Sequence, residues 1–272
     1  MSENIHPFAN RKTAILRYEP IEWNGLVFHP ITMENYDKWQ AIKPVLTLRQ
    51  GTLPAVYACM TFLQCVWALD YDARMSNGGS EGLWNALGMA LFLSLRLSDT
   101  DKIQAVGSAE DSKTLTSIRI VKDEQEHDIT PMEFNTVRKL IADQNGAELP
   151  DEADNPDLIE AAEDMQGSNG FQLNCDVGDF MTSVASSKGI RRKDLFFWPI
   201  KEFEDEVRAI KRRYGFFLAY IAESQGAKFT KGNPYPTWIF DKAKDEFAGL
   251  ISMEQLRSQH NADIATSDSA PI

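Results

Sequence analysis

The sequence predicts an α+β protein that is predominantly helical. An Asn-Gly pair between two short apolar runs near residue 24 predicts an N-terminal β-hairpin region. The alternating run Leu115 to Val121 predicts a small central β element, and apolar residues spaced three and four apart predict a long C-terminal amphipathic helix from Pro199 to Ser224. The chain has 272 residues, of which 43% are hydrophobic, so it can bury a substantial core.

The first element is the hairpin, within a stretch from Ala14 to Thr32 that we expect to be β structure. Asn24 and Gly25 both tolerate positive φ, and they separate the apolar runs Ile21–Trp23 and Leu26–Phe28. These two runs are therefore the expected strands.

Packed helices follow the hairpin. Thr32 is placed to cap a helix with Met33, Tyr36 and Trp39 on one face, and Pro44 should end or kink it. Two further apolar segments predict buried helices, which a glycine-rich loop joins with Ser80 as the cap; their ranges are Pro54–Leu69 and Ser80–Leu97.

The centre of the chain combines strand and helix signals. Leu115–Val121 should pair with Ile103–Val106, and the charged run Asp123–Asp128 reads as a solvated turn. Thr130-Pro131-Met132-Glu133 is a capping-box pattern with proline at the first helical position, and Asn145-Gly146 is a stop signal. We expect one helix between these signals.

The C-terminal part contains helices around Leu158–Met165 and Val177–Ser186, then the long helix with a heptad-like seam. Packing on a neighbouring helix of the same domain is the favoured explanation of that seam, and an intermolecular coiled coil is the alternative. The acidic, proline-marked connector after Gly146 suggests domains at 1–146 and 147–257 and a disordered tail at 258–272.

Charge restricts the possible functions. The net charge of −12 argues against general DNA or RNA binding. Residues 99–179 carry a net charge of −14, whereas residues 189–244 carry +5. These halves are either two solvated faces, or they pair with each other, or the basic half meets an acidic partner.

The sequence offers little for chemistry. The four histidines are scattered, the three cysteines form no disulfide framework, and no nucleophile or phosphate-loop motif is present. We therefore expect no enzyme, metal or cofactor, and neither a signal peptide nor a membrane-spanning helix. The cluster Arg191–Trp198 combines basic and aromatic residues that could contact nucleic acid, but stapling of the next helix is the simpler explanation.

Aromatic residues after the long helix are candidate partner anchors. Tyr235, Trp238 and Phe240 follow a turn that contains Gly232, Asn233 and Pro234. Exposed aromatic side chains in such a turn anchor protein partners, whereas packing in the core is the alternative.

Two segments, ITPMEFNTVRKLIADQNGAELPDEADNPDL and WPIKEFEDEVRAIKRRYGFFLAYIAESQGAKFTKGNPYPTW, resemble tail-module proteins of phages and prophages of Gram-positive bacteria. Ser224-Gln225-Gly226 departs slightly from the Ser-Gly turn of that pattern. The residues that carry the resemblance are, in the first segment, Thr130, Phe134, Arg138, Gln144, Asn145 and Gly146 and, in the second, Tyr214, Glu223, Gly226, Phe229, Lys231, Gly232 and Trp238.

The resemblance implies a tail assembly chaperone in the host cytoplasm. Such a protein keeps the helical tape-measure protein in solution and recruits tail-tube subunits, without a cofactor. A structural virion component and a phage-encoded regulator or inhibitor of a host system are the alternatives. The residues expected to bind the partner are Tyr214, Phe229, Lys231, Tyr235 and Trp238.

Overall fold

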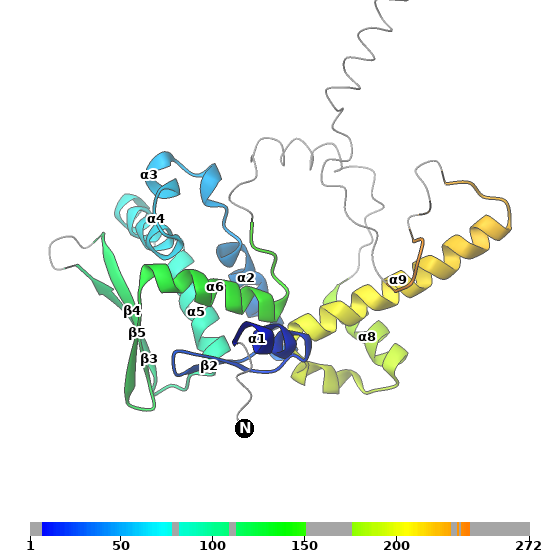
Figure 1. Cartoon of the computed structure of the whole chain (residues 1–272), viewed down its shortest axis with the longest axis horizontal. Helices are drawn as coiled ribbons and strands as arrows, with labels where there is room; N and C mark the ends of the chain where they lie inside the picture. The colour runs from blue at the N-terminus through cyan, green and yellow to red at the C-terminus, as the bar shows by residue number, and fades with distance from the viewer. Residues whose placement is uncertain are drawn as a thin grey trace, which may run out of the picture. The chain divides into compact units, whose positions relative to one another are not determined.

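The computed structural model describes residues 7–77, 82–108, 113–150, 176–229, 233 and 235–239, all within one compact unit. Its elements confirm an α+β fold that is predominantly helical, with an N-terminal hairpin, a central sheet and a long C-terminal helix (Figure 1). The predicted division into domains stays a prediction, and the expected helix at 158–165 and the expected disordered tail lie outside the described residues.

The N-terminal region begins with a helix that the sequence analysis missed. Helix α1 (Pro7–Leu16) includes Ala14, where we expected β structure to begin. Its Ala, Arg, Lys and Leu residues favour helix, and this local preference prevails until the hairpin. Strands β1 (Ile21–Trp23) and β2 (Leu26–Phe28) then pair antiparallel as predicted, around Asn24 at φ 48° and Gly25 at φ 77°.

The first helix after the hairpin differs from its prediction in detail. A 3-10 turn, η1 (Met33–Asn35), precedes α2 (Tyr36–Leu46), and the Thr32 side chain makes no capping hydrogen bond. Pro44 lies inside α2, which continues to Leu46. Burial of Val45 and Leu46 outweighs the backbone hydrogen bond that proline removes from this last turn.

The expected helix Pro54–Leu69 is wrong, because the segment breaks into two. After the 3-10 turn η2 (Gln50–Thr52), α3 (Ala55–Ala58) is short and buries no residue, whereas α4 (Phe62–Asn77) enters the core. The Gln50 amide donates to the carbonyls of Tyr57 (3.4 Å) and Met60 (3.0 Å), which satisfies backbone at the break. Helix α5 (Leu83–Leu95) follows with Gly82 at its cap position; Ser80 lies outside the described residues.

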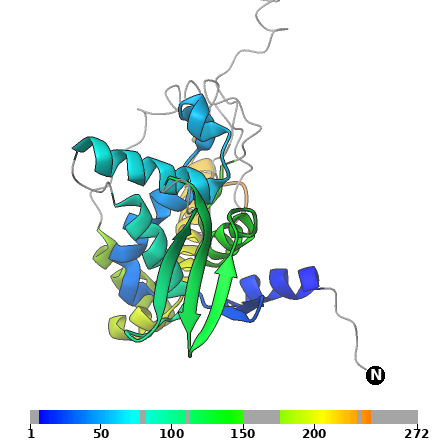
Figure 2. The ribbon, with the colours of Figure 1, turned by 90° about the vertical axis from the view of Figure 1, so that its left-hand side faces the viewer.

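The sheet has order β3-β4-β5, all antiparallel: β3 (Lys102–Gly107), β4 (Leu115–Lys122) and β5 (Gln125–Ile129). Figure 2 shows the three strands side by side. The pairing of β3 with β4 was predicted, but the solvated turn at Asp123–Asp128 is wrong. Only Asp123 and Glu124 form a turn, both with positive φ, and β5 follows. The charges of β5 are stabilised across the sheet, since Arg119 donates to both oxygens of Asp128 at 2.8 and 2.9 Å.

Helices α6 (Pro131–Asn145), α8 (Val177–Lys188) and α9 (Ile200–Ser224) confirm their predictions, whereas the 3-10 turn η3 (Arg192–Phe197) was not predicted. Helix α6 begins with the complete Thr130–Glu133 capping box and ends at Gly146 with φ 71°. Glu223 and Gln225 precede Gly226, whose φ of 90° ends the helical path as expected.

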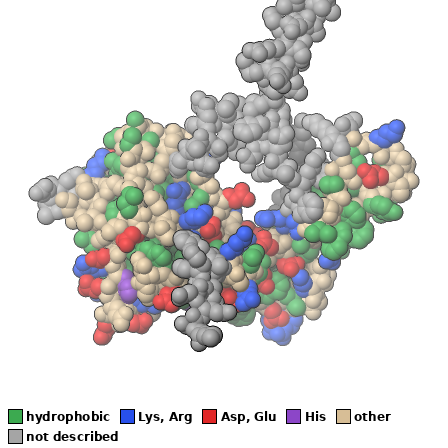
Figure 3. All heavy atoms as spheres, viewed as in Figure 1, with side chains coloured by type: hydrophobic (Ala, Val, Ile, Leu, Met, Phe, Trp, Pro, Cys, Tyr) green, Lys and Arg blue, Asp and Glu red, His purple; other side chains and the backbone are tan. Residues whose placement is uncertain are grey.

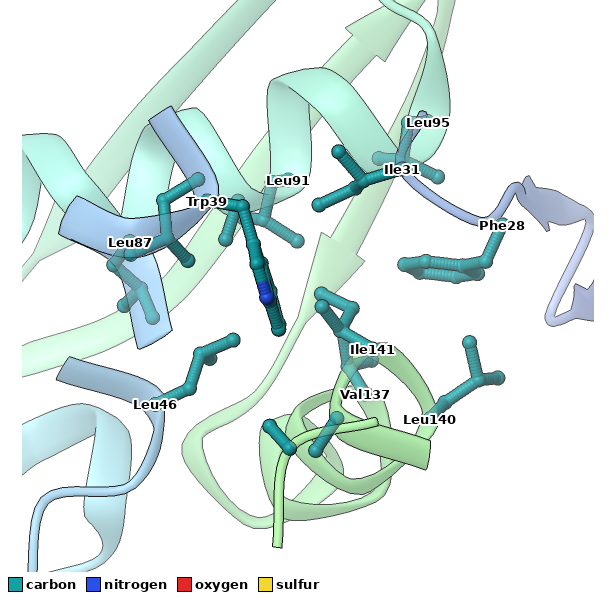
Figure 4. Packing of buried hydrophobic residues seen from close by; sticks show 14 of the residues in the cluster. Phe28, Ile31, Trp39, Leu46, Leu87, Leu91, Leu95, Val137, Leu140 and Ile141 are labelled. Carbon is teal, nitrogen blue, oxygen red and sulfur yellow. The ribbon is translucent and has the colours of Figure 1, made fainter. Parts of the chain in front are cut away.

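The core joins the hairpin to α2, α5 and α6. Figure 4 shows Trp39 of α2 between Leu87 and Leu91 of α5 and Ile141 of α6, with Phe28 of β2 nearby. Trp39 and Phe28 are completely buried. Removing such large side chains would cost several kcal/mol, so this cluster holds the N-terminal half together.

Helix α6 also carries buried polar side chains that bind backbone carbonyls at and just after the ends of α2 and β2. Arg138 donates to the carbonyls of Leu46 (2.7 Å) and Leu48 (3.1 Å), with its guanidinium 3.6 Å from the centroid of the Phe62 ring. Gln144 donates to the carbonyl of Phe28 at 3.1 Å. These bonds satisfy carbonyls that would otherwise be buried without a partner.

Asn145 completes this arrangement at the end of α6. Its Oδ1 accepts the Ile31 N–H at 2.7 Å, and its Nδ2 donates to the Ile141 carbonyl at 2.8 Å. Asn145 is fully buried, so no water can replace either bond.

Asn145→Ala should lower the free energy of unfolding by about 1–3 kcal/mol, because the buried Ile31 N–H loses its acceptor. Urea unfolding followed by circular dichroism measures this. The matched control is Asn35→Ala, whose side chain accepts only from the exposed Lys38, and its effect should stay within about 0.5 kcal/mol. Equal unfolding midpoints for the two variants would contradict the assignment.

Candidate functional site

Helix α9 is 25 residues long, and its neighbour α8 has 12. The first half of the apolar seam of α9 packs within the protein. Ile200 and Phe203 are buried, and Val207 and Ile210 pack against the core cluster. Packing inside the same domain, the favoured explanation of the seam, therefore holds for this half.

Ionic contacts surround the first half of α9. Lys188 at the end of α8 lies 2.6 Å from Glu206, and Tyr18 donates to Asp205 at 3.1 Å. Burial, then the Asp205 carboxylate, raises the pKa of Tyr18 to about 12, so its hydroxyl stays a donor at neutral pH. Burial also raises the pKa of Glu204, whose carboxylate lies next to Gly146.

The second half of α9 carries an apolar surface, which we call the open face. It comprises Tyr214, Phe217, Leu218 and Ile221, which lie on one side of a helix because they follow an i, i+3, i+4, i+7 spacing. Their exposed fractions are 63%, 52%, 67% and 50%. Hydrophobic side chains gather visibly over this part of α9 (Figure 3).

Contiguous exposure of this kind differs from scattered surface apolar residues. Single exposed leucines are ordinary, whereas an apolar helical stripe with aromatic residues is typical of a protein-binding surface. Tyr220, also 63% exposed, and the half-buried Phe216 extend the aromatic content beside the open face, with their rings stacked at 6.5 Å.

The charges near the open face are basic. From residue 207 to 229 the chain has one acid, Glu223, and five basic residues, a net charge of +4. The exposed members of this basic set are Arg208, which lies 3.7 Å from Asp205, and Lys211, Arg213 and Lys228. The first half of the same helix is acidic instead, with Glu202, Glu204, Asp205 and Glu206.

A segment after α9 lies against a different side of that helix. We call it the returning segment, and the structure describes its residues 233 and 235–239. A Cβ at Gly215 would lie 2.8 Å from three ring carbons of Tyr235, so the ring packs where the helix lacks a side chain. Asn233 fixes this segment, because its Nδ2 donates to Glu223 at 3.0 Å and its Oδ1 accepts the Tyr235 N–H at 2.8 Å. Tyr235 therefore packs on its own chain.

The five predicted partner-binding residues are placed differently from one another. Tyr214 belongs to the open face, and Trp238 is 52% exposed on the returning segment. Phe229 and Tyr235 are half-buried, and Lys231 lies outside the described residues, as does Phe240. Their role in binding stays a prediction.

The predicted partner-binding residues do not include Phe217, Leu218 or Ile221, although Phe217 and Ile221 belong to the predicted seam. The available signal was length: a predicted α8 of ten residues cannot cover a seam that continues to Ile221. The heptad pattern predicted α9, but it did not predict where α8 ends.

The basic and aromatic cluster Arg191–Trp198 is largely engaged in local structure. Arg191 binds both oxygens of Asp194 at 3.0 Å, and the Arg192 guanidinium lies beside Gly178 and Asp176 at the start of α8. Phe197, 76% exposed, borders a hollow of about 350 Å³.

Among the described residues, no group of three or more His, Cys, Asp or Glu side chains is placed to hold a metal ion. No described helix combines the length and the apolar character that crossing a bilayer requires. No protein-family model, curated protein or solved structure matches the chain.

Gly215→Ala should loosen the returning segment, because the new methyl group occupies the position of the Tyr235 ring. Limited trypsin digestion should cut after the exposed Lys228 several-fold faster than in the unmodified protein. The control is Gly88→Ala in α5, where a Cβ meets no atom within 4 Å. Identical cleavage rates in Gly215→Ala and the control would mean that the Tyr235 ring does not hold the segment.

Proposed function

We propose that this protein is a tail assembly chaperone that covers apolar helical surface of a tape-measure protein. The observation that carries the proposal is the open face of α9, whose four apolar side chains are each at least half exposed. The resemblance of Ile129–Leu158 and Trp198–Trp238 to phage tail-module proteins supplies the biological context. In this proposal the protein acts in the host cytoplasm, recruits tail-tube subunits and needs no cofactor.

A helix can bind this face through ordinary helix packing. Amphipathic helices dock by placing residues at i, i+3, i+4 and i+7 against an apolar stripe, and the open face has this spacing. A tape-measure protein exposes such stripes over a great length and aggregates unless they are covered. The acidic surface of the chaperone, at a net charge of −12, helps to keep the complex in solution.

The size of the face fits reversible binding. Residues 214–221 span two helical turns, or about 12 Å at 1.5 Å per residue. A surface of this length buries far less area than a permanent interface of the usual size. Weak single contacts allow a chaperone to leave when the tail tube assembles.

Phe217→Asp should abolish binding without unfolding the protein, because its side chain is 52% exposed in the middle of the open face. The test co-expresses the full chain with any very long helical open reading frame just downstream of its gene. The unmodified protein should bring that product into the soluble fraction. Phe217→Asp should reduce the soluble amount of the product at least about tenfold, because removal of a central anchor costs roughly 1.4 kcal/mol or more of binding free energy.

Phe197→Asp is the matched control, since Phe197 is more exposed but lies in η3, away from the open face. The melting temperatures of both variants should stay close to that of the unmodified protein. Neighbouring genes unrelated to tails, or a long protein that stays insoluble, would overturn the chaperone proposal. Stable presence in purified particles would support a virion component instead.

Trp238→Ala and Phe229→Ala test the other predicted anchors. Trp238 is 52% exposed, so its loss should reduce capture with little change in melting temperature. Phe229 is half-buried, so its loss should lower the melting temperature as well. Unchanged capture by both variants would remove these two residues from the site and leave the open face alone.

A further inference from the structure

The open face has cations on both of its sides. A helix turns once every 3.6 residues. Lys211 therefore lies one turn before Tyr214, on the edge of the open face that Leu218 forms. Arg213 lies one turn before Phe217, on the opposite edge. Both side chains are exposed. A helix that packs on the open face therefore meets one positive charge on each of its edges, at the end of the face near residue 211.

The acids nearest to these cations along α9 already have partners. Glu206 lines the same hollow as Arg213, but it pairs with Lys188 at 2.6 Å. Glu223 lies on the opposite side of α9 from Tyr214, nine residues or half a turn out of phase, and it accepts a hydrogen bond from Asn233 at 3.0 Å. Within residues 207–229 no other Asp or Glu occurs. The complementary charge has to come from the molecule that binds.

Two alternative occupants fit this charge pattern less well. A second copy of α9 in parallel would place Lys211 and Arg213 against their own equivalents, and an antiparallel copy would bring no acid to face them. An anionic lipid surface would attract the open face but repel the acidic first half of the helix and the chain as a whole, at net charge −12.

We infer that the open face takes an amphipathic helix that carries carboxylates on both sides of its apolar stripe. This inference rests on the proposed function for one point, that the partner is a helix. It adds that the partner helix is negatively charged beside its apolar stripe. The bound helix lies along Tyr214–Ile221, and its near end reaches a hollow of about 190 Å³ at the end of α8. Lys188, Ile210 and Arg213 line this hollow together with Glu206, which pairs with Lys188.

The test uses two designed helical peptides with leucines at the same positions and either Glu or Lys at the flanking positions. Fluorescence anisotropy measures the binding of each labelled peptide to the full chain at 50 and 500 mM NaCl. The Glu peptide should bind at least about tenfold more tightly than the Lys peptide at low salt, and the difference should shrink at high salt as rim charges are screened.

A charge-reversal variant tests the residues. The double variant Lys211→Glu with Arg213→Glu should reverse the preference toward the Lys peptide, and Phe217→Asp should remove the binding of both peptides. Lys193→Glu in η3 is the matched control, because this exposed lysine lies outside α9 and should leave the preference unchanged. Helical content by circular dichroism shows that each variant is folded.

Equal affinity for the two peptides, or tighter binding of the Lys peptide, would overturn the inference. Binding to phosphatidylserine vesicles with no binding to the Glu peptide would overturn it in favour of a lipid surface. Concentration-dependent dimers that Phe217→Asp dissociates, without peptide binding, would overturn it in favour of a second copy. Peptide preference is independent of the tape-measure experiment, so the charge inference and the chaperone proposal can fail separately.

Discussion

The Asn145 side chain holds the point on which the rest of the structure depends. Its Oδ1 accepts the Ile31 N–H at 2.7 Å, and the Ile31 carbonyl in turn accepts the Ile200 N–H at 2.9 Å. Two hydrogen bonds thus connect the end of α6, the segment after the hairpin and the first residue of α9. The Trp198 carbonyl adds a third by accepting the Met33 N–H at 2.9 Å.

This connection determines how α9 is presented. The base of the helix is fixed by backbone hydrogen bonds and by the buried side chains Ile200 and Phe203. The open face lies farther along the same continuous helix, so its side chains keep their spacing without support from a neighbouring helix. A surface that is already helical loses little conformational entropy when a partner binds, and this favours binding through few contacts.

Local signals predicted much of the fold. The capping box at Thr130, the stop at Gly146 and the turn at Asn24-Gly25 each depend on neighbouring residues only, and all three were predicted correctly. The failures depend on partners outside the segment itself, although these partners are close in the sequence. Strand β5 is stabilised by pairing with β4, and the break before α4 by the Gln50 amide, and neither partner is visible in the local pattern. For the candidate site, the heptad pattern predicted the helix, but exposure of the open face depends on where α8 ends.

The motif residues of α6 illustrate why a pattern alone does not assign a role. Arg138, Gln144 and Asn145, which carried part of the resemblance, are buried and bind loop carbonyls and a backbone N–H. They are therefore structural residues in this protein. The residues of the second motif divide differently, since Glu223 and Gly226 shape the returning segment whereas Tyr214 is exposed.

The packing of Tyr235 against Gly215 has a consequence for stoichiometry. Because Tyr235 packs on that side of α9, a helical partner would use the open face, and its contact with each copy would extend over about 12 Å. A long helical protein would then require a row of copies, and their number would grow in proportion to its length. The number of copies bound would in this way report the length of the helix that they cover.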